Sequence, residues 1–68
     1  MNTNHYPESV KPLFIRRAEL PGIVGISLSS IRRLEAAGDF PARRKLGPGV
    51  VGWSLAEVQA WAATRDAV

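Results

Sequence analysis

The sequence predicts a mainly α-helical domain with a small β-hairpin wing, a three-helix winged helix-turn-helix. Three observations predict this fold. Two short helical segments are separated by a turn that contains glycine, which is the pattern of a helix-turn-helix. Two short extended runs then flank a Gly-Pro-Gly turn, which is the pattern of a hairpin. A last helix follows, with a strong start signal at Ser54.

The chain is short and lacks the covalent and metal supports that small domains often use. It has 68 residues, no cysteine and one histidine, His5. The absence of cysteine excludes disulfides and thiolate metal sites, and we expect no metal and no cofactor at a lone histidine in a polar segment. The core has to come from apolar packing, for which a hydrophobic content of 46% suffices. The absence of cysteine also fits a cytoplasmic protein.

The N-terminal segment differs from the rest of the chain. Residues 1–12 show no hydrophobic periodicity and include Pro7 and Pro12, which predicts a flexible arm ahead of a folded domain over residues 13–66. The apolar run Leu13–Ile15 is expected to lie extended against the core. The segment has no signal-peptide regions, and apolar runs in the chain are far too short to span a membrane, so we expect no membrane partner.

The first helix is expected over residues 18–24, with Leu20 and Ile23 facing inward. Pro21 is tolerated only in a first turn, where backbone N–H groups have no partner within the helix. The helix therefore has to start close to Ala18 or be irregular there. Gly25 is expected to end it, because glycine readily adopts the left-handed conformation.

The second helix is expected over residues 28–37, with Ser27 as its N-cap. Gly38 is expected to close it in the same way as Gly25 closes the first helix. Apolar residues three apart predict the buried face of this helix, namely Leu28, Ile31 and Leu34. The polar side chains of this helix are expected on its other faces, namely those of Ser29, Ser30, Arg32 and Arg33.

A hairpin is expected from residues 42–46 and 50–53, joined by the turn Gly47–Gly49. Its first strand contains three adjacent cations that folding alone does not require, Arg43, Arg44 and Lys45. The arrangement is well explained as a wing that lies along a sugar-phosphate backbone.

The third helix is expected from about Leu55 to Arg65 and has the best start signal in the chain. Ser54 and Glu57 form a predicted capping box, in which the serine caps the helix and the glutamate reaches back to the N-cap backbone. Trp53 and Trp61 are expected mainly in the core.

The positive charge of the chain is clustered. The net charge is +3, and seven of the nine Lys and Arg residues occur in three groups along the sequence. Clustered cations suit a polyanion, because each neutralised phosphate releases condensed counterions. The alternative for each group is ordinary solvated surface charge. The groups are Arg16 and Arg17, Arg32 and Arg33, and Arg43, Arg44 and Lys45.

An ordered series of short motifs carries a family resemblance. The motifs are Gly25-Ile26-Ser27, Gly38-Asp39-Phe40-Pro41, Lys45-Leu46-Gly47, Val51-Gly52-Trp53 and Glu57-Val58-Gln59-Ala60-Trp61. Residues 14–66 thereby resemble the AlpA and excisionase group of prophage regulators, within the MerR-like winged-helix superfamily. The sequence departs from the family pattern at Leu28, where the family often has arginine, and at Pro21.

The resemblance implies a protein that binds double-stranded DNA. Such proteins activate or repress phage genes, or act as excisionases, the recombination directionality factors that bend DNA so that an integrase performs excision. Expected partners besides DNA are an integrase or further copies of the chain on repeated sites. The alternative function is a small protein-interaction module that modulates an integrase or a transcription regulator.

Each polar residue of the second helix and the wing has an expected role. Arg33 reads a base, since guanidinium pairs bidentately with guanine, while Ser29 contacts base or phosphate and Arg32 holds phosphate. The free N–H groups from Ser27 to Ser30 favour an anion. The wing cations Arg43, Arg44 and Lys45 meet the backbone or the minor groove, and Arg16 and Arg17 touch flanking phosphates.

Catalysis is not expected. The sequence shows no paired carboxylates that converge on a cleft, and the only histidine lies in the predicted arm. Gly47–Gly49 is not a phosphate-binding loop, because no Gly-Lys-Ser/Thr follows it. We therefore expect neither an enzyme nor a small-molecule substrate.

Overall fold

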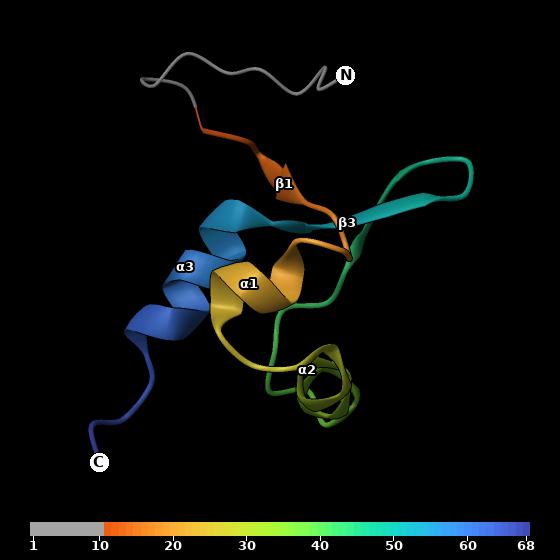
Figure 1. Ribbon diagram of the computed structural model, residues 1–68. Coiled ribbons are helices and arrows are strands. Elements are labelled where there is room, and N and C mark those ends of the chain that lie inside the picture. The colour runs from red at the N-terminus through yellow and green to blue at the C-terminus, as the bar shows by residue number, and fades with distance from the viewer. Residues whose placement is uncertain (1–10) are drawn as a thin grey trace.

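The structure is a computed structural model that describes residues 11–68. Residues 1–10 of the predicted arm lie outside the described residues. Three helices and a small antiparallel sheet make up the fold (Figure 1). Within residues 11–68, none of the helices has the length and apolarity that crossing a membrane takes. The elements are β1 (Phe14–Ile15), α1 (Leu20–Val24), α2 (Leu28–Ala36), β2 (Arg44–Gly47), β3 (Val50–Ser54) and α3 (Leu55–Ala63).

The sheet has three strands in the order β1-β3-β2. The predicted hairpin is confirmed as β2 and β3, and Gly49 in its turn has φ 68°. The predicted fold was incomplete, because the run before the first helix pairs antiparallel with the other side of β3, with Ile15 opposite Trp53. A strand of two residues is too short to show a period of two, so the pairing had no sequence signal.

Helix α1 begins at Leu20, two residues later than the expected start at Ala18, because Pro21 is confined to the first turn of a helix. Gly25 ends it with φ 94°, and its N–H donates to the carbonyl oxygen of Pro21. The prediction that Ile23 faces inward was wrong, since this side chain is 53% exposed. The helix has only five residues, and the inward residues are Leu20 and Val24, four apart along one face.

Helix α2 begins and ends as predicted to within one residue. The hydroxyl of Ser27 accepts the N–H of Ser30 at 3.2 Å, which satisfies a backbone donor that the first turn leaves free. At the other end Gly38 has φ 79°, and the N–H of Asp39 donates to the carbonyl oxygen of Leu34 at 2.8 Å. This is the Schellman arrangement, in which a left-handed glycine lets the chain turn back over the last helical carbonyls.

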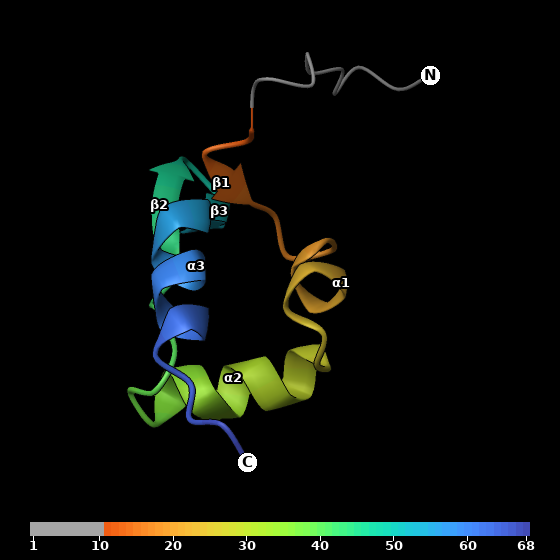
Figure 2. The ribbon, with the colours of Figure 1, turned by 90° about the vertical axis from the view of Figure 1, so that its left-hand side faces the viewer.

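The core lies between the sheet and the helices. Trp53 and Ile31 are almost fully buried, which confirms Trp53 as a core residue, whereas Trp61 is half-buried and packs edge-on against Phe40. Ile31 anchors one side of α2 in the core, and Ser29, Arg32 and Arg33 on its other side are exposed. Figure 2 shows α2 at the lower end of the fold, below α1 and α3. The buried side chains are Ile15, Leu20, Ile31, Phe40, Trp53 and Val58.

The start of α3 corrects one expectation. The hydroxyl of Ser54 accepts the N–H of Glu57 at 3.2 Å, so the serine caps the helix as predicted. The reciprocal half of the capping box is not formed, because both carboxylate oxygens of Glu57 bind the side chain of Arg44 in β2. A guanidinium competes well for a carboxylate, since it has a full positive charge and two N–H donors, whereas the N-cap backbone has one neutral donor.

Gly52 is packed closely against its neighbours. A Cβ there would lie 2.9 Å from Cδ1 of Leu46 and 3.2 Å from the carbonyl oxygen of Ile15. The leucine can move, but the carbonyl belongs to the backbone of β1. We expect Gly52→Ala to lower the free energy of unfolding by about 1–3 kcal/mol, as overpacked sites do, measured by urea denaturation followed through tryptophan fluorescence.

Gly22→Ala is the matched control, because nothing lies within 4 Å of a Cβ at that position. An alanine inside a helix is expected to be neutral or slightly stabilising there. Equal losses for the two variants would contradict the packing argument at Gly52.

Candidate nucleic-acid interface

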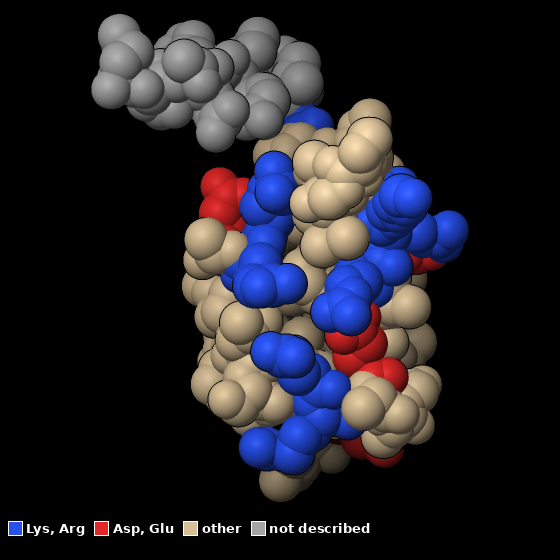
Figure 3. Space-filling model, turned by 90° about the vertical axis from the view of Figure 1, so that its right-hand side faces the viewer, with Lys and Arg blue, Asp and Glu red and all other residues tan. Residues whose placement is uncertain are grey.

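Lys and Arg side chains gather on one face of the molecule. Figure 3 shows them over α2, the β2–β3 hairpin and the segment between β1 and α1, with a few acidic side chains among them. We call this surface the cationic face and the β2–β3 hairpin the wing. The three predicted cation groups come from separate elements, and the fold brings members of each group to the same side.

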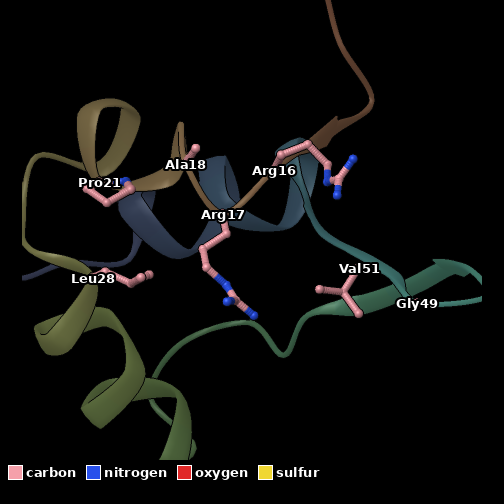
Figure 4. A pocket seen from close by; sticks show the side chains of 7 residues that line it. All are labelled: Arg16, Arg17, Ala18, Pro21, Leu28, Gly49 and Val51. Atoms are coloured by element: carbon pink, nitrogen blue, oxygen red, sulfur yellow. The ribbon is translucent and has the colours of Figure 1, made fainter.

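A groove crosses the cationic face between α2 and the wing. Its walls come from the segment after β1, the start of α2 and the hairpin, through Arg16, Arg17, Ala18, Pro21, Leu28, Gly49 and Val51. Arg17 extends into the space between Leu28 and Val51, and Arg16 lies nearer the hairpin (Figure 4). The contact of these two arginines with flanking phosphates stays a prediction, and the structure places both of them at the groove.

The polar side of α2 is open to solvent. Ser29, Arg32 and Arg33 are exposed, and Ser30 is half-buried. Hydrogen bonds link the hydroxyl of Ser27 to that of Ser30 at 3.0 Å, and Nη2 of Arg33 to the Ser30 hydroxyl at 3.3 Å. Ser27 and Ser30 therefore support the helix start and the arginine, while Arg32 and Ser29 form no hydrogen bond with a side chain among residues 11–68.

The cations of the wing strand point to different sides. Arg44 is opposite Gly52, and Lys45 is opposite Val51. Residues directly opposite each other share one face of the sheet, and successive residues alternate between faces. Lys45 therefore shares the side of Val51, which lines the groove, and Arg44 is on the other side.

Arg44 forms an ion pair with Glu57 at the start of α3. Nε and Nη2 of the guanidinium donate to the two carboxylate oxygens, and the Nε–Oε1 distance is 3.4 Å. The hydrogen bond with Glu57 and the attraction between the charges raise the pKa of Arg44. The same hydrogen bond holds the pKa of Glu57 below its ordinary value. Both groups are thus charged near neutral pH.

Backbone contacts connect the wing to the helices. Oε2 of Glu35 in α2 accepts the N–H of Arg43 at 2.9 Å, just before β2 begins. Nε1 of Trp61 in α3 donates to the carbonyl oxygen of Asp39 in the loop after α2. The position of the wing relative to α2 is therefore set by side chains as well as by the sheet.

Comparison with known proteins identifies the family. Residues 13–66 match the family described as prophage CP4-57 regulatory protein (AlpA). The chain belongs to this family. It is also similar to a protein of Enterobacteria phage P4 named "Uncharacterized protein ORF88", with 38% identity over 61 residues that cover 90% of this chain and 69% of that protein. No solved structure matches the chain.

The AlpA assignment confirms the family resemblance that the motifs predicted. It makes the chain a member of a family of prophage regulators. Placement in the MerR-like superfamily, and a role in excision, stay predictions. The individual site residues likewise stay predictions, although the structure brings most of them to one face.

Sequence reasoning missed the two glutamates that contact the wing of this AlpA-family chain. Glu35 and Arg43 are eight residues apart, and Arg44 and Glu57 are thirteen apart. Neither separation matches the three or four residues that bring side chains together on one helix. Only the path of the chain through the loop and hairpin makes these contacts, so the sequence held no signal for them.

Proposed function

We propose that this AlpA-family chain is a regulator that binds double-stranded DNA of a phage or prophage. The observation that supports the proposal is the gathering of cations from three separate elements on one face, beside an open polar side of α2 (Figure 3). A helix anchored on one side and polar on the other fits the major groove. Cations on both sides of it suit the phosphates that border that groove.

In this proposal α2 reads bases and the surrounding elements hold the backbone. Arg33 is positioned to pair with guanine, and Arg32 to hold phosphate. Ser29, next to them and exposed, contacts a base or a phosphate. Lys45 and Arg43 place the wing on the sugar-phosphate backbone, and Arg17 and Arg16 hold the strand that lies over the groove.

The finer function is sequence-specific binding, either as a transcription regulator or as an excisionase. Both activities need a recognition helix and a wing, and a protein that bends attachment-site DNA also needs several phosphate contacts. The proposed function is one of binding, without catalysis or a small-molecule substrate. Helices α1 and α2 followed by the wing have the order of a winged helix-turn-helix. This order supports assignment of the chain to the MerR-like superfamily.

The test is DNA binding as a function of salt. We expect a duplex selected from DNA fragments of the surrounding prophage to bind, with a slope of log affinity against log salt of about −0.9 for each of roughly four to six phosphate contacts. Fluorescence anisotropy with a labelled duplex measures both affinity and slope. Binding that survives high salt, or that requires another protein, would instead favour the protein-interaction module.

A further inference from the structure

The proposed function assigns no role to the ion pair between Arg44 and Glu57. It joins the outer strand of the wing to the first turn of α3, on the side of the sheet away from Lys45 and Val51. The carboxylate of Glu57 lies so close to the wing that it weakens the attraction of the wing for phosphate. Its position therefore needs an explanation. A contribution to folding is a weak explanation, because an exposed ion pair adds little to the free energy of unfolding.

The geometry of the pair determines what Arg44 can bind. The two guanidinium N–H groups that point at Glu57 donate to both carboxylate oxygens, and such forked pairs hold the side chain in one orientation. The Arg44 side chain is still 59% exposed. A DNA phosphate can therefore reach Arg44, but it has to compete with the carboxylate of Glu57.

We infer that Glu57 is a specificity-determining residue, which keeps Arg44 from binding phosphate and so limits binding to DNA of unrelated sequence. The inference rests on the proposed DNA-binding function. Sequence-independent affinity grows with each cation that meets phosphate. On the selected site the base contacts of α2 fix the wing with Lys45 toward the DNA and Arg44 on the far side of the sheet, so a freed Arg44 adds little there. On unrelated DNA no base contact fixes this orientation, and a freed Arg44 can meet phosphate.

The inference predicts affinity changes of different size for the two kinds of DNA. Glu57→Gln removes the negative charge but keeps the backbone N–H that donates to Ser54. We expect affinity for an unrelated duplex to rise about fivefold at roughly 0.1 M salt, and the salt slope to steepen by up to about 0.9, which is one further phosphate contact. Affinity for the selected duplex is expected to rise less, so that the ratio of the two affinities falls.

Two further variants separate release of Arg44 from a change of net charge. Glu19→Gln makes the same change of charge at a carboxylate that forms no salt bridge with residues 11–68 and no capping bond in α1. We expect it to leave the ratio of affinities nearly unchanged. The double variant Arg44→Gln with Glu57→Gln is expected to return the salt slope to that of the unchanged protein, because the released cation is gone.

The experiment measures all four proteins by anisotropy, on the selected duplex and on a shuffled duplex of equal length, after circular dichroism shows equal helix content. A steeper slope for Glu57→Gln that the double variant reverses supports the inference. Equal slopes for Glu57→Gln and the unchanged protein, or equal effects of Glu57→Gln and Glu19→Gln, overturn it while the proposed function stands. If the unchanged protein shows no salt-dependent binding, both fail together.

Discussion

Trp53→Ala is expected to unfold the domain. Trp53 is 1% exposed and is the largest of the fully buried side chains, and removal of a buried tryptophan side chain costs about 3–5 kcal/mol. A domain of fewer than 70–80 residues rarely has more than about 3–5 kcal/mol of stability in total. Circular dichroism at 25 °C is therefore expected to show loss of helix, and fluorescence from Trp61 to shift toward that of an exposed indole.

Trp53→Phe is the control for this prediction. Nε1 of Trp53 is buried and has no hydrogen-bond partner among the described residues, so phenylalanine loses volume without leaving a partner unpaired. We expect the phenylalanine variant to stay folded with a reduced urea midpoint. If Trp53→Ala keeps a cooperative transition close to that of the unchanged protein, the core does not depend on this side chain.

The elements of the fold could be predicted where the sequence carries a local signal. Ser27 and Ser54 marked the starts of α2 and α3, and Gly25 and Gly38 marked helix ends, because caps act between residues that are neighbours in the chain. The hairpin was also predicted from its turn. The run Leu13–Ile15 was predicted to be extended, but its pairing with β3 was missed, since the partner Trp53 is far away in the sequence.

The candidate site could be predicted in part. The arginines were identified by their clustering in the sequence. The side of the molecule to which each one points could not be predicted. Arg44 and Lys45 are neighbours with opposite directions, and a bulge between Lys45 and Gly47 changes the register of the hairpin. Arg17 reaches the groove because the segment after β1 passes between α2 and the wing (Figure 4). Both facts depend on tertiary geometry, for which one sequence holds no signal.

Arg33→Ala and Lys45→Ala are expected to weaken DNA binding in different ways. Arg33 is on the exposed side of α2, and its loss is expected to cost about 1–3 kcal/mol on the selected duplex and to relax the preference at one base pair. Lys45 is on the groove side of the wing strand. Its loss is expected to weaken all duplexes about equally and to reduce the salt slope by about one contact.

Arg33→Lys separates base reading from charge. Lysine keeps the positive charge but cannot form the paired bonds that a guanidinium makes with guanine. Affinity for the shuffled duplex is therefore expected to be retained, while the preference for the selected duplex falls nearly as far as in Arg33→Ala. Anisotropy on both duplexes, with single base-pair changes in the selected one, measures the difference. Equal and small losses for Arg33→Ala and Lys45→Ala on both duplexes would show that α2 does not read sequence through Arg33.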